Sequence, residues 1–134
     1  MIMVKEQYVN YDTAIMLKNR GFNAPCGAYY SEFVDDWKTL KFWKCGKPKT
    51  YDEVRNSGYL LVPSQSIARR WLREERKVDI EIRGYWKLDS EYHIDHYMFE
   101  LHYANAPSHS INERYATYED ACEAAIKYCV ENVI

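Results

Sequence analysis

The chain has 134 residues, of which 47% are hydrophobic and 28% charged, with a formal net charge of −2 at pH 7. A chain of this length buries roughly two thirds of its unfolded surface, so we expect a single domain over residues 1–134 that needs no metal or disulfide. No apolar run approaches the ~20 residues that cross a bilayer, and the N-terminus lacks a signal peptide's apolar region. We predict a cytoplasmic protein without membrane contact.

Charged and cysteine residues refine this picture. Residues 1–83 contain 15 Lys and Arg against 11 Asp and Glu, whereas residues 84–134 contain 3 against 9. Such asymmetry is compatible with partner binding or with two solvated faces of opposite sign.

The cysteines lack C-x-x-C spacing, which favours buried free thiols in a reducing compartment over a zinc site or a disulfide framework. They are Cys26, Cys45, Cys122 and Cys129.

Residues 10–22 carry signals for both ends of a helix. Asn10 can accept a hydrogen bond from a backbone N–H of the first turn. Gly21 fits the left-handed position after the last turn, and Phe22 is placed to contact Leu17.

Residues 28–34 are strand-like, but residues 35–43 allow two interpretations. A turn at Asp35 and Asp36 would make 37–43 the second strand of a hairpin, which we favour; a helix capped by Ser31 is the alternative.

Residues 50–82 contain the most informative stretch. Thr50 and Glu53 have capping-box spacing, which predicts one or two helical turns ending near Gly58. The apolar run 59–62 is too short to classify. Ser64 can cap a helix that runs to residue 76, and from Val78 the apolar period changes to two, as in a half-buried strand. We expect the helix to fold back on the sheet that its own strand joins. Its apolar stripe would then pack on Ile80 and Ile82; the stripe consists of Ile67, Ala68, Trp71 and Leu72.

The last third of the chain predicts a hairpin and a helix. Gly84 suggests a bulge, residues 87–91 a polar turn, residues 92–103 a long strand and residues 105–110 an exposed loop. Thr117 and Asp120 have capping-box spacing before an apolar stripe, so a helix follows. Together these signals predict an α+β fold: a mostly antiparallel sheet with the central and C-terminal helices on one face and the first helix beside them.

Histidines offer little support for metal binding or catalysis. His96 and His102 share a strand face but lie roughly 20 Å apart at ~3.3 Å per residue. His93 with Asp95 could join a metal site only with a residue from elsewhere, and no motif of a hydrolase, P-loop or dinucleotide-binding protein occurs. An enzyme would need a pocket where His93, Asp95 or His109 meets other polar groups. We therefore predict no catalytic residue, metal or cofactor. Between an enzyme and a protein without catalytic activity, we favour the second.

Basic residues form the strongest functional pattern. Lysines without an intervening acid are interleaved with aromatic rings over residues 38–49, and further cations follow on the central helix. This arrangement suits phosphate contact with base stacking, although the pI is not basic and a solvated face explains it too. The candidate nucleic-acid-binding residues are Lys38, Lys41, Trp43, Lys44, Lys47, Lys49, Arg69, Arg70, Arg73, Arg76 and Lys77.

A second candidate surface is aromatic. It could contact a protein or ligand, or reflect ordinary packing across a hairpin; its members are Tyr85, Trp86, Tyr92, Tyr97 and Tyr103.

Five short segments resemble small uncharacterised proteins encoded by phages and mobile elements of gut bacteria: residues 18–22, 63–66, 70–74, 80–82 and 118–125. The resemblance covers about half of the chain and is most distinctive in Ser64-Gln65-Ser66 with Arg70-Trp71-Leu72-Arg73. It implies a small accessory protein and carries over no catalytic or binding residue. Our leading hypothesis is a non-enzymatic protein that binds an unknown host or phage protein, and the alternative is a nucleic-acid-binding module. The oligomeric state is not predicted.

Overall fold

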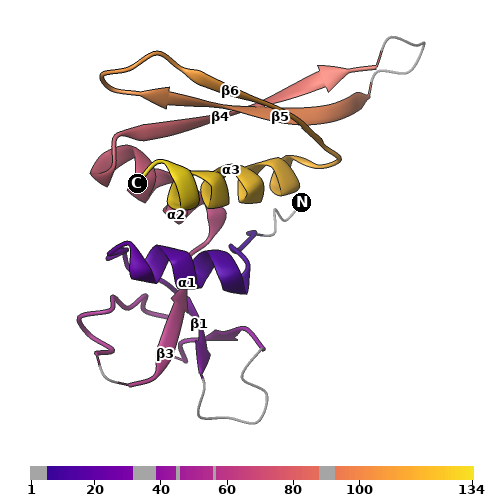
Figure 1. Cartoon of the computed structure of the whole chain (residues 1–134). Coiled ribbons are helices and arrows are strands. Elements are labelled where there is room, and N and C mark those ends of the chain that lie inside the picture. The colour runs from indigo at the N-terminus through magenta and orange to yellow at the C-terminus, as the bar shows by residue number, and fades with distance from the viewer. Residues whose placement is uncertain (1–5, 32–38, 45, 56, 88–92) are drawn as a thin grey trace. The chain divides into compact units, whose positions relative to one another are not determined.

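The computed structural model describes residues 6–31, 39–44, 46–55, 57–87 and 93–134 (Figure 1). The strands form two antiparallel three-stranded sheets, and helices pack on them, which confirms the predicted α+β class. The elements of the described residues are, in chain order, α1 (Tyr11–Asn19), β1 (Ala28–Ser31), β2 (Lys41–Phe42), β3 (Tyr59–Val62), α2 (Gln65–Glu75), β4 (Val78–Trp86), β5 (Ile94–Tyr103), β6 (His109–Tyr115) and α3 (Tyr118–Asn132).

The chain divides into two compact units, Met1–Trp71 and Leu72–Ile134, which we call the N-terminal unit and the C-terminal unit. The boundary falls inside α2. The expectation of one main sheet is wrong because each unit has its own sheet, with strand orders β2-β1-β3 and β4-β5-β6. The unclassified run 59–62 is β3, which pairs with β1 rather than with the later strands. Folding of all 134 residues as one domain stays a prediction.

In the N-terminal unit, α1 begins and ends where the sequence predicts. Asn10 Oδ1 accepts from the backbone N–H of Thr13 at 2.9 Å. Gly21 has φ +84°, and the backbone N–H of Phe22 donates to the carbonyl of Leu17 at 3.0 Å, which closes the helix. The helix packs against β3. These local signals therefore place one helix over this sheet.

The favoured hairpin at residues 28–43 is supported by strand pairing. β1 and β2 are antiparallel, with Ala28 opposite Phe42 and Tyr29 opposite Lys41. The expected turn at residues 35–36 lies outside the described residues. The capping box is confirmed, since Thr50 N–H donates to Glu53 Oε1 at 3.1 Å and Glu53 N–H donates to Thr50 Oγ1 at 3.4 Å. It closes a turn rather than the expected helical segment.

The helix α2 forms where the sequence predicts it, and Trp71 adds a contact. Ser64 Oγ accepts from the N–H of Ile67 at 3.2 Å, and Trp71 is buried. Within its own unit the Trp71 ring lies 5.2 Å from Phe22 between centroids, and Nε1 donates to Asn23 Oδ1 at 2.9 Å. We had expected Ile80 and Ile82 as its partners. Helical periodicity predicts that this side chain is buried but does not identify Phe22 or Asn23.

In the C-terminal unit, α3 covers one face of the β4-β5-β6 sheet (Figure 1). Alternate residues of the strands supply the core, and polar residues occupy the other face. Thr117 Oγ1 caps α3 by accepting from the N–H of Asp120 at 3.0 Å. The buried residues are Val78, Ile80, Phe99 and Leu101 from the sheet and Ala121, Cys122, Ala125, Ile126, Cys129 and Val130 from α3.

Three further details test the sequence predictions. The expected loop at 105–110 is wrong in its last two residues, because β6 begins at His109 and pairs with β5. Only Ile111 and Tyr115 of β6 are even half-buried, so its sequence lacks a clear alternation of apolar residues. The irregularity expected near Gly84 lies between Tyr85 and Trp86. Three cysteines are buried free thiols, as predicted: Cys26, Cys122 and Cys129. Cys45 lies outside the described residues.

Candidate functional site

The predicted basic residues are divided between the two units. The N-terminal unit holds Lys41, Trp43, Lys44, Lys47, Lys49, Arg69 and Arg70, and the C-terminal unit holds Arg73, Arg76 and Lys77. Lys38 lies outside the described residues. Lys44 and Lys47 are exposed, whereas Lys41 and Lys49 are half-buried. Four of the predicted lysines thus lie on one short segment of the N-terminal unit.

Trp43 is the aromatic residue on which base stacking would depend. Its ring stacks on Tyr29 at 4.0 Å between centroids, lies 5.3 Å from Tyr59 and has the Lys49 ammonium 4.9 Å from its centroid. Nε1 donates to the carbonyl of Cys26 at 3.0 Å. These contacts give Trp43 a packing role on its sheet, so a nucleobase would have to displace one of them.

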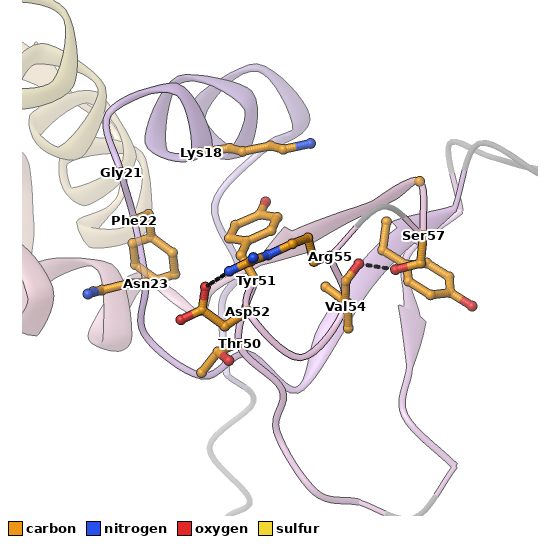
Figure 2. A pocket seen from close by; sticks show the side chains of 12 residues that line it. Lys18, Gly21, Phe22, Asn23, Thr50, Tyr51, Asp52, Val54, Arg55 and Ser57 are labelled. Carbon is orange, nitrogen blue, oxygen red and sulfur yellow. Dashed lines mark hydrogen bonds and ion pairs between the residues drawn. The ribbon is translucent and has the colours of Figure 1, made fainter.

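A cleft of about 510 Å³ lies within the N-terminal unit, between the end of α1 and the turn at residues 50–58 (Figure 2). Aromatic rings form much of its wall, and Lys18 reaches across it so that its ammonium lies 5.5 Å from the centroid of the Tyr51 ring. Arg55 and Asp52 point toward each other, with Nη2 and Oδ1 3.1 Å apart. A ligand with a flat body and one negative group would match this lining.

The cleft was not predicted from the sequence because its walls come from separate segments. Tyr51 joins it to the sheet: the backbone N–H of Leu61 donates to the Tyr51 hydroxyl at 2.9 Å. Burial raises the pKa of Tyr51, which therefore stays protonated at neutral pH. Among the described residues, Lys18 makes no ion pair, so its charge is the one available to a ligand there. The sequence signals near this cleft were the helix end at Gly21 and Phe22 and the capping box at Thr50.

The residues proposed for an enzyme are not brought together. His93 precedes β5, whereas His109 begins β6 opposite Leu101, near the far end of β5. Asp95 Oδ2 lies 2.9 Å from Nδ1 of His96, and this contact lowers the pKa of Asp95. Three cavities formed by described residues, of about 510, 210 and 120 Å³, are lined by none of His93, Asp95 or His109.

A polar cluster on the open face of the second sheet was also missed. Glu81 and Glu100 are directly opposite on β4 and β5, and His102 Nε2 lies 2.8 Å from Glu81 Oε1. One potential ligand atom from each of these three residues lies within 4.8 Å of the others, a spacing that could hold a metal ion. Arg83 nevertheless bonds to Glu81 and lies 3.1 Å from Glu100, so a cation already compensates both carboxylates. The arrangement is an ion-pair network, and the Arg83 and His102 bonds lower the pKa of Glu81.

Exposed aromatic residues gather at the end of β4. Trp86 is 60% exposed and Tyr85 is 40% exposed, although the Tyr85 ring stacks on His96 at 4.9 Å. Of the other predicted aromatic residues, Tyr97 and Tyr103 are half-buried and Tyr92 lies outside the described residues. Among the described strands, β4 pairs with β5. β4 therefore ends in two neighbouring exposed aromatic residues.

Comparisons with known proteins add no further constraint. No family model matches the sequence, and neither a curated protein nor a solved structure matches it. Within the described residues, no helix has the length and apolar character needed to span a membrane.

Proposed function

We propose that this protein is a non-enzymatic binding protein, and that it contacts a partner protein through the aromatic end of β4. The observation that carries the proposal is the exposure of Trp86, at 60%, beside the 40% exposed Tyr85. Tryptophan and tyrosine dominate the binding energy of protein interfaces because they bury a large rigid surface. The resemblance to phage and mobile-element proteins and a cytoplasmic location stay predictions.

The test compares two equally exposed aromatic residues. The wild-type protein, Trp86→Ala and the control Phe42→Ala, whose side chain is 55% exposed in the other unit, are used as bait in an extract of the native cells. We expect one stoichiometric partner, identified by mass and reconstituted in pure form, whose binding weakens roughly thirtyfold with Trp86→Ala, equivalent to about 2 kcal/mol. Equal binding by Trp86→Ala and the wild type would overturn the proposal.

Nucleic-acid binding is the second candidate function. It is favoured by the exposed Lys44 and Lys47 and by the absence of acidic residues from positions 39–49. If several phosphates are neutralised, affinity for an unrelated oligonucleotide should fall steeply as salt rises, and Lys44→Gln with Lys47→Gln should flatten that slope. Lack of retention at low salt would exclude this candidate.

A further inference from the structure

We propose that the cleft between the end of α1 and the turn at residues 50–58 binds a small aromatic molecule that carries one carboxylate. The cleft has a volume of about 510 Å³, within the ~300–1,000 Å³ typical of small-molecule sites. Its lining residues all belong to the N-terminal unit, so the site shares no residue with the aromatic end of β4. Ligand binding here does not depend on the protein contact proposed above.

The charged side chains of the cleft leave one positive charge for a ligand. They are Lys18, Asp52 and Arg55. Arg55 Nη2 lies 3.1 Å from Asp52 Oδ1, so these two residues compensate each other. Lys18 is exposed and, among the described residues, pairs with no carboxylate. Its ammonium lies 5.5 Å from the centroid of the Tyr51 ring, and this cation–π contact holds the charge at the cleft (Figure 2). The lining therefore suits a ligand with a single negative charge.

The aromatic rings that line the cleft are each held by contacts of their own. Phe22 is 3% exposed. The Tyr51 hydroxyl accepts from the backbone N–H of Leu61 at 2.9 Å, and the Tyr59 ring lies 5.0 Å from the Tyr29 ring between centroids. Because these rings lose little freedom when a ligand arrives, a flat ring can pack on them at low entropic cost.

A carboxylate fits the polar lining better than a phosphate. A phosphate monoester carries about −1.5 to −2 charges at pH 7 and has three acceptor oxygens that need donors. The hydroxyl groups of the lining are already engaged, since Ser57 Oγ donates to a backbone carbonyl and Thr50 Oγ1 donates to Glu53 Oε1 at 3.3 Å. Arg55 would have to leave Asp52 to compensate a second negative charge. A single carboxylate requires neither change.

The position of Lys18 sets the orientation of the ligand. A second hollow, of about 210 Å³, shares Lys18, Gly58 and Tyr59 with the cleft, so Lys18 borders both. A carboxylate at this ammonium lies at the border of the cleft. The ring of the ligand then extends into the larger space beside Phe22 and Tyr51.

Titration of the full chain with naphthoate and with naphthamide, followed by amide chemical shifts, tests the proposal. Both probes have the same flat ring system, but only naphthoate carries a charge. We expect naphthoate to bind with a Kd on the order of 1 mM or tighter, as suits a ligand of its size. The shifts should lie in residues 18–23 and 50–59. Naphthamide should bind roughly tenfold more weakly, because it lacks a charged partner for the ammonium.

Substitution of Lys18 separates this charge from ring packing. Lys18→Gln should weaken naphthoate binding roughly tenfold and remove the preference for naphthoate over naphthamide. Lys44→Gln is the matched control, because Lys44 is an exposed lysine of the same unit that does not line the cleft, and it should bind naphthoate like the wild type. Unchanged shifts elsewhere in the spectrum verify that Lys18→Gln is folded.

Absence of saturable shifts in these two segments would overturn the proposal. Equal affinities of naphthoate and naphthamide for the wild type would do the same, as would equal affinities of naphthoate for Lys18→Gln and the wild type. Naphthyl phosphate that binds more tightly than naphthoate would overturn the assigned ligand class. None of these results involves Trp86, so failure of this site and failure of the proposed function are measured separately.

Discussion

Trp71 shows at the scale of one residue what the sequence can and cannot predict. Its place on the apolar stripe of α2 predicted burial, and it is 5% exposed. The hydrogen bond to Asn23, 48 positions away, is not encoded in that periodicity. The same limit applies to Lys18 and Tyr51, whose cleft forms only when α1 and the 50–58 turn meet.

Truncation of Trp71 should therefore be costly. Trp71→Ala should lower the free energy of unfolding by about 3–5 kcal/mol, because it removes a buried ring. Trp71→Phe keeps most of that volume but loses the bond to Asn23, so a loss of about 1–2 kcal/mol is expected. Urea unfolding measures both values. Equal losses of unfolding free energy for the two variants would contradict the assignment of ring burial as the main contribution of Trp71 to stability.

The buried thiols should be unreactive in the folded protein. Burial raises the pKa of Cys26 and of Cys129 to about 12 each, so almost no thiolate is present at pH 8. Iodoacetamide should label neither residue until urea is added, as peptide mass spectrometry can measure. Unfolded thiols ionise near pH ~8.5, whereas the buried thiols stay protonated. The stability gained by burying these two thiols in the protonated form is therefore complete below that pH and declines above it. Labelling at the unfolded rate would show that these thiols are accessible.

At the scale of elements, local sequence signals predicted the helix ends correctly. The sequence did not predict which strands pair with each other. Helix ends were predicted well because a cap involves residues three positions apart, as at Asn10, Ser64 and Thr117. The two sheets and β6 depend on which distant strands meet, and β6 has too few buried residues to show the alternation of a strand. The cluster around Glu81 and Glu100 was missed for the same reason, since the register alone places them opposite each other.

The cap of α3 provides a direct test of this local logic. Thr117→Ala removes the oxygen that accepts from the N–H of Asp120, and should cost about 1 kcal/mol of stability. Thr117→Ser retains the hydroxyl and should cost much less. Thermal unfolding of the two variants makes the comparison. The cap would have no energetic role if Ala and Ser gave the same midpoint.

At the scale of the whole molecule, the division into units follows the division of charge. Residues 1–71 contain 11 Lys and Arg against 7 Asp and Glu, whereas residues 72–134 contain 7 against 13. The sequence asymmetry therefore coincides with two compact units, although it did not predict them. The N-terminal unit carries the cleft and the exposed lysines, and the C-terminal unit carries the exposed aromatic end of β4.

Hydrogen exchange of the protein with and without its purified partner tests the central claim most directly. A partner that covers Tyr85 and Trp86 would slow amide exchange at the end of β4. We predict that the amides of residues 83–86 exchange more slowly in the complex than in the protein alone, whereas the amide of Phe42 in the other unit does not change. Exchange of residues 83–86 at the same rate in both samples would contradict a protein contact at this aromatic end.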